Sequence, residues 1–296
     1  MSETPAGAVP KAALWMIGSI VSFSAMAVAG RWVSSGLDTF EIMLYRSLLG
    51  VLIVGTIVLV TGRRREVATR HLGTHIIRNI SHFTGQNLWF YAITVIPLAQ
   101  VFALEFTGPI WAMLLAPLVL GERLTWPRSL AALVGFLGIL IVTRPSPETL
   151  SPGLFAAASA AIGFAGSAIF TRKLTRTDST LCILFWLTLT QAVMGLVCAG
   201  FDGDIALPAA EAVPGVIVIG LAGLCAHYCL TTALGLAPAS VVMPIDFTRL
   251  PVIAIVGMML YQEPLDPWVL LGAAIIFAAN YVNILRETRA ARRAGV

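Results

Sequence analysis

Ten apolar stretches account for most of this chain, and each is about long enough to cross a lipid bilayer. A spanning helix needs roughly 20 apolar residues. Lipid offers the backbone no hydrogen-bond partners, so these stretches are expected to be helical. We therefore predict an all-α integral membrane protein of about ten transmembrane helices, with little room for a separate soluble domain. The predicted spans are residues 12–33, 39–61, 72–95, 97–119, 126–143, 152–173, 179–199, 213–236, 238–260 and 267–285.

The amino-acid composition also indicates a membrane environment. Apolar residues make up 58% of the 296 residues and charged residues 11%, whereas a soluble domain carries roughly 25% charged residues. The net charge of +4 does not indicate a nucleic-acid partner, because the basic residues lie in short runs between apolar stretches. The lipid bilayer is the expected partner of the outer surface. Nothing in the pattern requires a second copy, so a monomer is expected.

Basic residues are distributed unevenly between the two ends of the predicted bundle. Of the 19 Lys and Arg residues, 14 fall in the loops and terminal segments of one side. The positive-inside rule places that side in the cytoplasm. Both termini are then cytoplasmic in a multi-pass protein of the cell (inner) membrane, and loop 200–212 lies outside. The first apolar run lacks a small-residue cleavage site, so we expect a retained helix rather than a signal peptide.

The chain repeats itself at a constant offset of 141 residues. Glu105-Phe-Thr coincides with Asp246-Phe-Thr, and a proline lies eight residues before each acidic residue. The shared offset runs without a gap from the first span to the start of the fifth. Further coincident pairs are Pro97 with Pro238, Glu122 with Glu263, Arg31 with Arg172 and Thr39 with Thr180.

Each copy of the repeat holds five spans, so the second copy enters the membrane from the opposite side. We therefore predict two inverted five-helix repeats, residues 12–143 and 152–285. Inverted repeats are the architecture of many secondary transporters, in which two halves alternate around a central cavity. The alternative is that duplication only built a stable bundle.

The ends of the two copies carry a recognisable pattern. Leu120-Gly-Glu-Arg-Leu-Thr-Trp-Pro-Arg-Ser-Leu-Ala-Ala-Leu-Val-Gly-Phe-Leu-Gly resembles the end of an EamA-type domain, and Tyr261-Gln-Glu-Pro-Leu-Asp-Pro-Trp-Val-Leu-Leu-Gly is its partner. Two such domains resemble the drug/metabolite transporter superfamily over essentially the whole chain. In size and layout the chain is similar to the YddG-like bacterial amino-acid exporters. The second copy departs from the pattern at Phe277-Ala-Ala-Asn-Tyr281, where the family usually continues with glycine.

The resemblance implies a secondary transporter that moves small metabolites by alternating access. The substrate class that it favours is amino acids, exported, with aromatic or apolar side chains. A multidrug or cation antiporter of the same fold is the first alternative. An intramembrane enzyme that uses Glu105 and Asp246 is another, but no zinc, serine-elbow or phosphate-loop motif accompanies these residues. A receptor would normally carry an extramembrane domain. We therefore predict no enzymatic activity and no cofactor.

Polar side chains inside predicted spans are the candidate substrate-binding residues, because such groups avoid lipid. Asn79, His82 and Gln86 share one face of the third span, and His75 extends that face. His227 lies in the eighth span beside Tyr228 and is the repeat mate of Gln86. The alternative role for these residues is hydrogen bonding between helices. His82 is the strongest candidate, because histidine changes charge near neutral pH and can couple transport to protons.

Glu105 and Asp246 are repeat mates within the fourth and ninth spans. Pro109 and Pro251 follow them and remove backbone donors, so we predict broken helices beside the cavity. A carboxylate beside freed carbonyls suits an amine or a coupling ion. The alternative is an ion pair with Arg46, Arg78 or Arg249, the last of which is one helical turn from Asp246. Pro97, Pro238 and Pro244 are further predicted helix starts or kinks.

Aromatic and cysteine residues give weaker indications. Trp186 is a candidate to line a cavity for apolar or aromatic substrates, although most deep aromatic side chains only pack. The chain has four cysteines, Cys182, Cys198, Cys225 and Cys229. Cys225 and Cys229 are one turn apart, but a metal site needs a complete ligand set. We therefore expect the cysteines to act as small apolar residues and predict no metal site.

Overall fold

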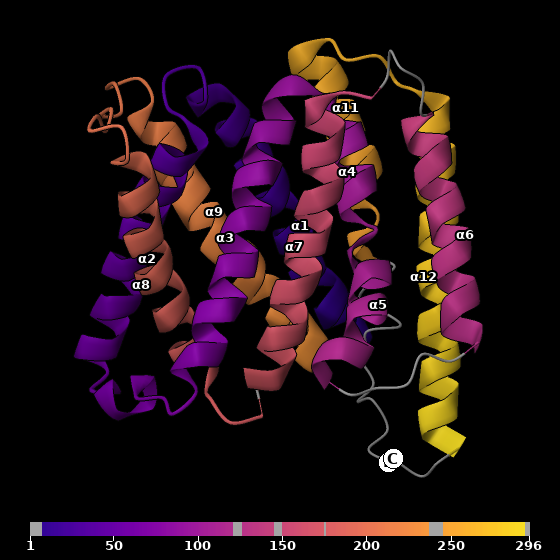
Figure 1. The fold of residues 1–296 in the computed structure, drawn as a ribbon, viewed down its shortest axis with the longest axis horizontal. Coiled ribbons are helices and arrows are strands. Elements are labelled where there is room, and N and C mark those ends of the chain that lie inside the picture. Colours follow the sequence, from indigo (N-terminus) through magenta and orange to yellow (C-terminus); the bar gives the residue numbers. More distant parts are fainter. Residues whose placement is uncertain (1–7, 121–125, 145–149, 175, 237–244, 294–296) are drawn as a thin grey trace.

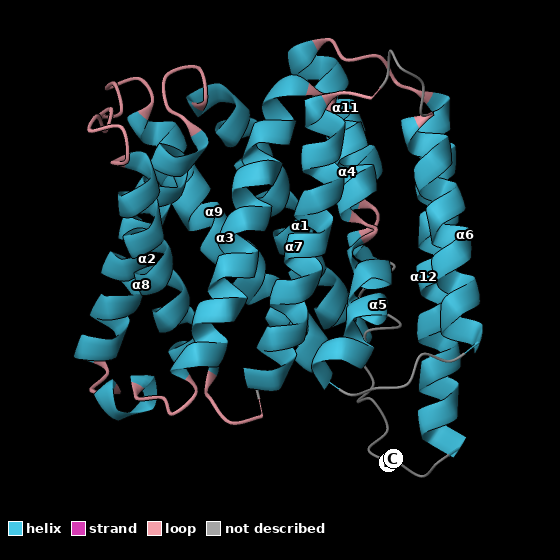
Figure 2. Ribbon diagram, viewed as in Figure 1, coloured by secondary structure: helices cyan, strands magenta, loops and turns pink. Residues whose placement is uncertain are grey.

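The computed structural model describes residues 8–120, 126–144, 150–174, 176–236 and 245–293, and these form helices without any strand (Figure 2). Each predicted span contains a described helix, and the fourth contains two. The helices are α1 (Ala8–Val33), α2 (Thr39–Val60), η1 (Arg64–Val67), α3 (Leu72–Val95), α4 (Leu98–Glu105), α5 (Gly108–Leu120), α6 (Trp126–Thr143), α7 (Pro152–Leu174), α8 (Thr180–Ala199), α9 (Val213–Leu236), α11 (Arg249–Tyr261) and α12 (Pro267–Arg293).

Many of these helices have the length and composition of membrane spans. Large apolar side chains cover the outer surface, including Leu52 and Val60, which are 66% and 80% exposed. The chain is therefore an all-helical, multi-pass membrane protein. Within the described part of the chain, six segments meet the criteria for a full span: Pro10–Val33, Thr39–Val60, Leu98–Leu115, Pro152–Thr171, Thr180–Ala199 and Val213–Leu230.

The helices pack in pairs that join the two halves of the sequence. α1 lies along α9, α3 along α7, α2 along α8 and α6 along α12 (Figure 1). An offset of 141 residues exchanges the α1/α9 pair with the α7/α3 pair. The same offset exchanges the two members of the α2/α8 pair and of the α6/α12 pair. This arrangement supports the interpretation of two equivalent halves.

Close packing of α6 on α12 depends on two glycines. A Cβ atom at Gly138 would lie 2.9 Å from the carbonyl oxygen of Gly272, and one at Gly272 would lie 2.7 Å from that of Gly138. Any larger residue would force these helices apart. Asn280, where the second copy departs from the family pattern, donates a hydrogen bond of 3.0 Å to the Phe106 carbonyl. The departure at Asn280 therefore adds a contact between α12 and the residue that follows α4. It leaves the packing of Gly138 against Gly272 unchanged.

The fourth and ninth predicted spans are both interrupted. α4 ends at Glu105 and α5 begins at Gly108, next to Pro109. In the ninth span a turn at residues 247–248 precedes α11, which has Pro251 in its first turn. The predicted breaks are thus confirmed, and Pro97 immediately precedes α4 as predicted. Pro238 and Pro244 lie outside the described residues.

The two breaks face each other. The rings of Phe106 and Phe247, which are repeat mates, stack with centroids 4.4 Å apart. The hydroxyl groups of Thr107 and Thr248, also repeat mates, each donate to the carbonyl three residues earlier. The same local geometry therefore recurs in both halves at their line of contact.

A charged cluster ties the halves together at the end of the bundle where α1 ends and α4 begins. Arg31 donates to Glu263 and to the carbonyl groups of Ile93 and Ile96. Glu263 also accepts the backbone N–H of Leu98 at 2.9 Å. Glu263 thus caps a helix of the opposite half. Its repeat mate Glu122 lies outside the described residues.

Candidate functional site

Glu105 and Asp246 lie together and share one arginine. The Arg249 guanidinium donates to Glu105 Oε1 at 3.0 Å and to Asp246 Oδ2 at 3.3 Å. Trp89 Nε1 donates to the other Glu105 oxygen at 2.9 Å. Glu105 is the last residue of α4, and Asp246 lies three residues before the start of α11. Two repeat mates that are 141 residues apart in the sequence therefore lie side by side.

Arg249 is itself enclosed by aromatic rings. Its side chain is 4% exposed, and its guanidinium carbon lies 4.7 Å from the Phe23 centroid and 5.1 Å from those of Phe102 and Phe106. Such cation–π contacts stabilise a buried cation. The two carboxylates therefore have a built-in counter-ion, which is the ion-pair alternative raised for them. In this state they do not offer a free anionic site to an amine.

Four rings from four helices form a continuous row beside this ion pair. Phe23 of α1 lies 5.5 Å from His227 of α9, and His227 lies 6.1 Å from His82 of α3. His82 in turn lies 5.8 Å from Phe164 of α7. Phe23 and Phe164 are repeat mates, so the two histidines lie between equivalent rings. Sequence reasoning placed His82 and His227 at similar depth, and the structure brings them into contact.

His82 has an unused hydrogen-bonding atom in this row. Its side chain is buried, and Nε2 has no hydrogen-bond partner among the residues that the structure describes. Gln86, one turn further along α3, is 3% exposed. A buried polar atom without a partner costs free energy, so it often marks a functional position.

Arg46 of α2 and Arg78 of α3 are buried close to the histidines. Within the described residues Arg46 has one hydrogen bond, a weak one of 3.6 Å from Nη1 to the sulfur of Met43. Arg78 donates to Thr171 Oγ1 at 3.0 Å and to Asn79 Oδ1 at 2.8 Å. Within the described ranges neither guanidinium contacts a carboxylate. Arg46 and Arg78 thus bring two buried positive charges into this part of the bundle.

A small cavity opens in front of Arg46. Its volume is about 20 Å³, and its walls come from α2, α8 and α9. Arg46, Gln191 and His227 are among the residues that line it. The Gln191 Nε2 donor is buried and has no hydrogen-bond partner among the described residues. Arg46 and Gln191 thus bring donor groups to the lining of this cavity, and such donors suit an anion.

The remaining predicted site residues lie elsewhere. The Asn79 amide donates to the Trp186 carbonyl at 3.0 Å and to Thr190 Oγ1 at 2.6 Å, so it links α3 to α8. Trp186 Nε1 donates to the Val67 carbonyl near the end of the bundle. Tyr228 is 63% exposed and packs edge-on against Trp15 on the outer surface. The structure does not bring these three side chains to the cavity.

Two other features do not form part of this site. A larger hollow of about 190 Å³ lies between α6 and α12 and is lined mainly by alanine, leucine and valine. Cys225 and Cys229 have sulfur atoms 3.9 Å apart. Among the described residues, no third metal-ligating side chain joins them.

Sequence reasoning treated Arg46 and Arg78 only as counter-ions for the acidic pair and did not select Gln191. A signal was present, because a charged residue inside an apolar span is expensive and usually functional. Arg46 lies within a span that contains only one other charged residue, Glu41. The sequence does not reveal which arginine forms the ion pairs with Glu105 and Asp246.

Comparisons with known proteins agree with this architecture. The model of the EamA-like transporter family matches twice, at residues 10–144 and 151–285. One solved crystal structure aligns with a TM-score of 0.63 at 18% identity and covers 94% of this chain and 98% of its own. That likeness concerns the fold.

Two similar proteins have names that state what they transport. The S-adenosylmethionine uptake transporter of Rickettsia conorii is 26% identical over 279 residues, which is 94% of either chain. The riboflavin transporter of Brucella anthropi is 29% identical over 287 residues and is covered completely, with 94% of this chain aligned. Both relatives are named as transporters, and neither name describes an enzyme.

Proposed function

Since this chain belongs to the EamA-like transporter family, we propose that it moves a small metabolite that carries a carboxylate, such as an amino acid or a derivative of one. Transport proceeds by alternating access between two inverted repeats, residues 12–143 and 152–285, which together provide ten spans. The repeat offset and the exchange of helix pairs support this arrangement.

The observation that carries the substrate class is the unpaired basic cluster. Arg46 and Arg78 are 9% and 7% exposed and contact no described carboxylate. Two buried cations without a counter-ion are costly, and a bound carboxylate would offset that cost through charge-assisted hydrogen bonds. The Gln191 amide supplies a further donor. The phenyl rings beside His82 and His227 offer an apolar wall for the rest of the substrate.

The acidic pair supports the same choice. A multidrug or cation antiporter needs a carboxylate that is free to hold a cation. Glu105 and Asp246 are both bonded to Arg249. An anionic or zwitterionic substrate is therefore favoured over a simple cation.

The size of the cavity indicates that the halves must move. Small-molecule sites have volumes of roughly 300–1,000 Å³, whereas the cavity beside Arg46 measures about 20 Å³. We propose that rocking of one repeat against the other enlarges it. Such a cycle is reversible, so the gradients of the solute and of any coupled ion set the direction of transport.

A competition experiment tests the substrate class. Purified protein in proteoliposomes would be loaded with labelled amino acids that have apolar or aromatic side chains, and exchange would be measured against unlabelled competitors. Phenylalanine and S-adenosylmethionine should compete, whereas phenethylamine, which lacks only the carboxylate of phenylalanine, should not. Equal competition by phenethylamine would contradict carboxylate recognition. Competition by riboflavin alone would assign a different substrate.

The orientation in the inner membrane is also proposed, with both termini in the cytoplasm. Asp202 lies in the exposed loop between α8 and α9. In a variant whose native cysteines are replaced, Asp202→Cys should react with an impermeant thiol reagent in intact cells after outer-membrane permeabilisation. Reaction only after lysis would reverse the orientation.

A further inference from the structure

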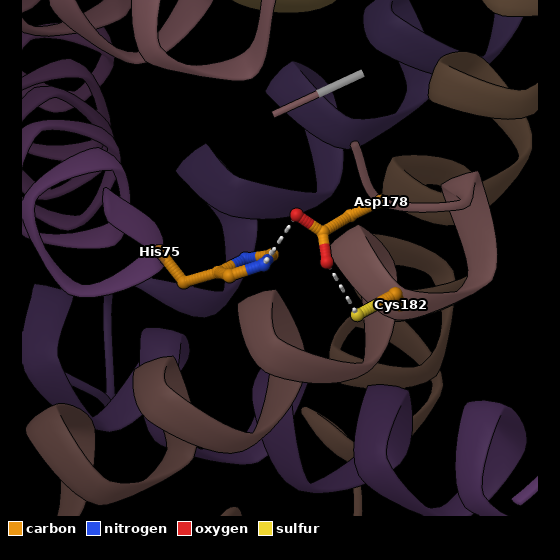
Figure 3. A group of neighbouring side chains, drawn as sticks. All are labelled: His75, Asp178 and Cys182. Carbon is orange, nitrogen blue, oxygen red and sulfur yellow. Dashed lines mark hydrogen bonds and ion pairs between the residues drawn. The ribbon is translucent and has the colours of Figure 1, made fainter. Parts of the chain in front are cut away.

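Metal-ligating side chains meet where α3 and α8 begin, at the end of the bundle opposite Arg31. His75 comes from the first turn of α3, Asp178 from the loop before α8, and Cys182 from the first turn of α8 (Figure 3). Their ligand atoms all lie within 4.8 Å of one another. His75 is about a hundred positions away from Asp178 and Cys182 in the sequence, so only the fold brings it to them.

His75 is the residue of this group whose hydrogen-bonding atoms are least satisfied. Its side chain is completely buried, and neither ring nitrogen has a hydrogen-bond partner in the described part of the chain. Figure 3 shows its ring directed at the carboxylate, with Nε2 3.9 Å from Asp178 Oδ2. Leaving two buried ring nitrogens unsatisfied costs free energy. A ligand at this point would use one of them.

Asp178 is oriented towards both neighbours. Its Oδ1 lies 3.7 Å from Cys182 Sγ, and the Thr177 hydroxyl donates to Oδ2 at 2.9 Å. Burial acts to raise the pKa of Asp178, but hydrogen bonds from Thr177 and Thr69 and the nearby histidines outweigh it and hold that pKa below its usual value. The Asp178 carboxylate thus lies between the His75 imidazole and the Cys182 thiol.

His71 lies at the edge of this group, although its ring nitrogens are not among the atoms that lie within 4.8 Å of one another. Its Nδ1 lies 3.3 Å from Asp178 Oδ2, and its side chain is 46% exposed. His71 precedes α3, so it lies one turn from His75. Its exposure provides a path for entry from solvent. Arg78, the next charged residue along α3, donates to Thr171 and Asn79 and not to this cluster.

We propose that His71, His75, Asp178 and Cys182 form a binding site for a divalent transition metal, with Zn²⁺ as the ion that their chemistry suits best. Imidazole, carboxylate and thiolate groups are all ligands that Zn²⁺ takes in tetrahedral sites, whereas Mg²⁺ and Ca²⁺ take oxygen ligands. Binding deprotonates the Cys182 thiol, and the proton leaves to solvent. The carboxylate and thiolate then balance the charge of the ion.

This site goes beyond the proposed transport function and does not depend on it. It joins α3 of the first repeat to α8 of the second. A metal bound there would tie the two halves together at one end of the bundle. If the halves move against each other, Zn²⁺ should slow transport by restraining them.

The test is metal binding to the purified full-length protein without a polyhistidine tag. Competition with a chromophoric chelator should give one Zn²⁺ per chain. His75→Ala and Cys182→Ser should each weaken binding on the order of 100-fold. Cys198→Ser, in the same helix but outside the cluster, is the matched control and should bind like the wild type. Gel filtration establishes that each variant is folded.

Co²⁺ gives an independent measurement. Its complex with the wild type should show a thiolate charge-transfer band and the visible absorption of tetrahedral Co²⁺, and Cys182→Ser should lose the charge-transfer band. Wild-type Zn²⁺ affinity in both His75→Ala and Cys182→Ser would overturn the proposal. A Co²⁺ spectrum without thiolate ligation would also overturn it. Neither result bears on transport of the carboxylate substrate.

Discussion

Arg249 and Arg46 are both buried in the bundle, yet they lie in opposite electrostatic surroundings. Arg249 bonds two carboxylates and faces three aromatic rings. Arg46 has a methionine sulfur as its only described hydrogen-bond partner. A charge that the protein neutralises itself holds structure together. A charge left without a counter-ion is available to a ligand, and this difference separates scaffold from site.

The largest effect is expected at the neutralised arginine. Arg249→Met leaves the buried Asp246 and the partly buried Glu105 without a counter-ion, which should destabilise the protein by about 3–5 kcal/mol. The apparent Tm in detergent should fall steeply or folded protein should not be recovered. Thermal unfolding followed by gel filtration measures this.

The matched control removes all three charges together. Glu105→Gln and Asp246→Asn combined with Arg249→Met should recover much of the lost stability, because no uncompensated charge remains. An Arg249→Met protein as stable as the wild type would show that the pair is not structural. The contrast with Arg46 would then disappear.

The next effect separates stability from transport. Arg46→Gln removes a cation that bonds no described carboxylate, so stability should stay close to that of the wild type. Exchange should fall about 10- to 100-fold, because a charge-assisted hydrogen bond contributes about 1.5–3 kcal/mol. Arg46→Lys should retain part of the activity. Unchanged exchange by Arg46→Gln would exclude Arg46 from the substrate site.

A smaller effect is expected at the imidazole row. His82→Ala removes the ring between His227 and Phe164 and should reduce exchange by about 3- to 10-fold through a loss of roughly 1 kcal/mol of contact. If His82 couples transport to protons, the pH dependence of exchange should flatten as well. Phe83→Leu, at the neighbouring position on α3, is the control. Wild-type exchange with an unchanged pH profile would assign His82 to packing.

The smallest effect is expected at the ion pair between Arg31 and Glu263, which joins the two halves at one end of the bundle. Glu263→Gln removes the charge that pairs with Arg31 across the halves but keeps an oxygen that can accept from Arg31 and from Leu98, so the loss should be about 1 kcal/mol. The halves should open more often at this end. A cysteine at Ile96, which is 9% exposed, should then react faster with a thiol reagent in the Glu263→Gln background. An unchanged rate would show that Arg31 and Glu263 do not hold this end shut.

Most of the scaffold was predictable because lipid leaves the backbone few choices. Span lengths, short loops and the prolines beside Glu105 and Asp246 located the helices and their breaks. The Glu263 contact with Leu98 was not predictable in the same way. A carboxylate that caps a helix of the opposite half leaves no trace in local periodicity.

The candidate site was only partly predictable. The stripe containing His82 and Gln86 follows from helical spacing, and its depth relative to His227 follows from the repeat. Which cation neutralises Glu105 and Asp246 depends on side-chain geometry across four helices. His75, Asp178 and Cys182 were likewise unpredictable as a group, since they meet only through packing of α3 on α8.

The stacked pair Phe106 and Phe247 shows what fusion of two gene copies makes possible. An ancestral pair of separate, identical chains would carry every residue twice, so each arginine would appear on both sides of the symmetry axis. In the fused chain the positions equivalent to Arg46, Arg78 and Arg249 are Leu187, Ile219 and Gly108. Selection could therefore place charge in one copy while the axis residues stayed alike. In the proposed transport cycle, duplication supplies two equivalent halves, and divergence of the copies allows a single, one-sided site between them.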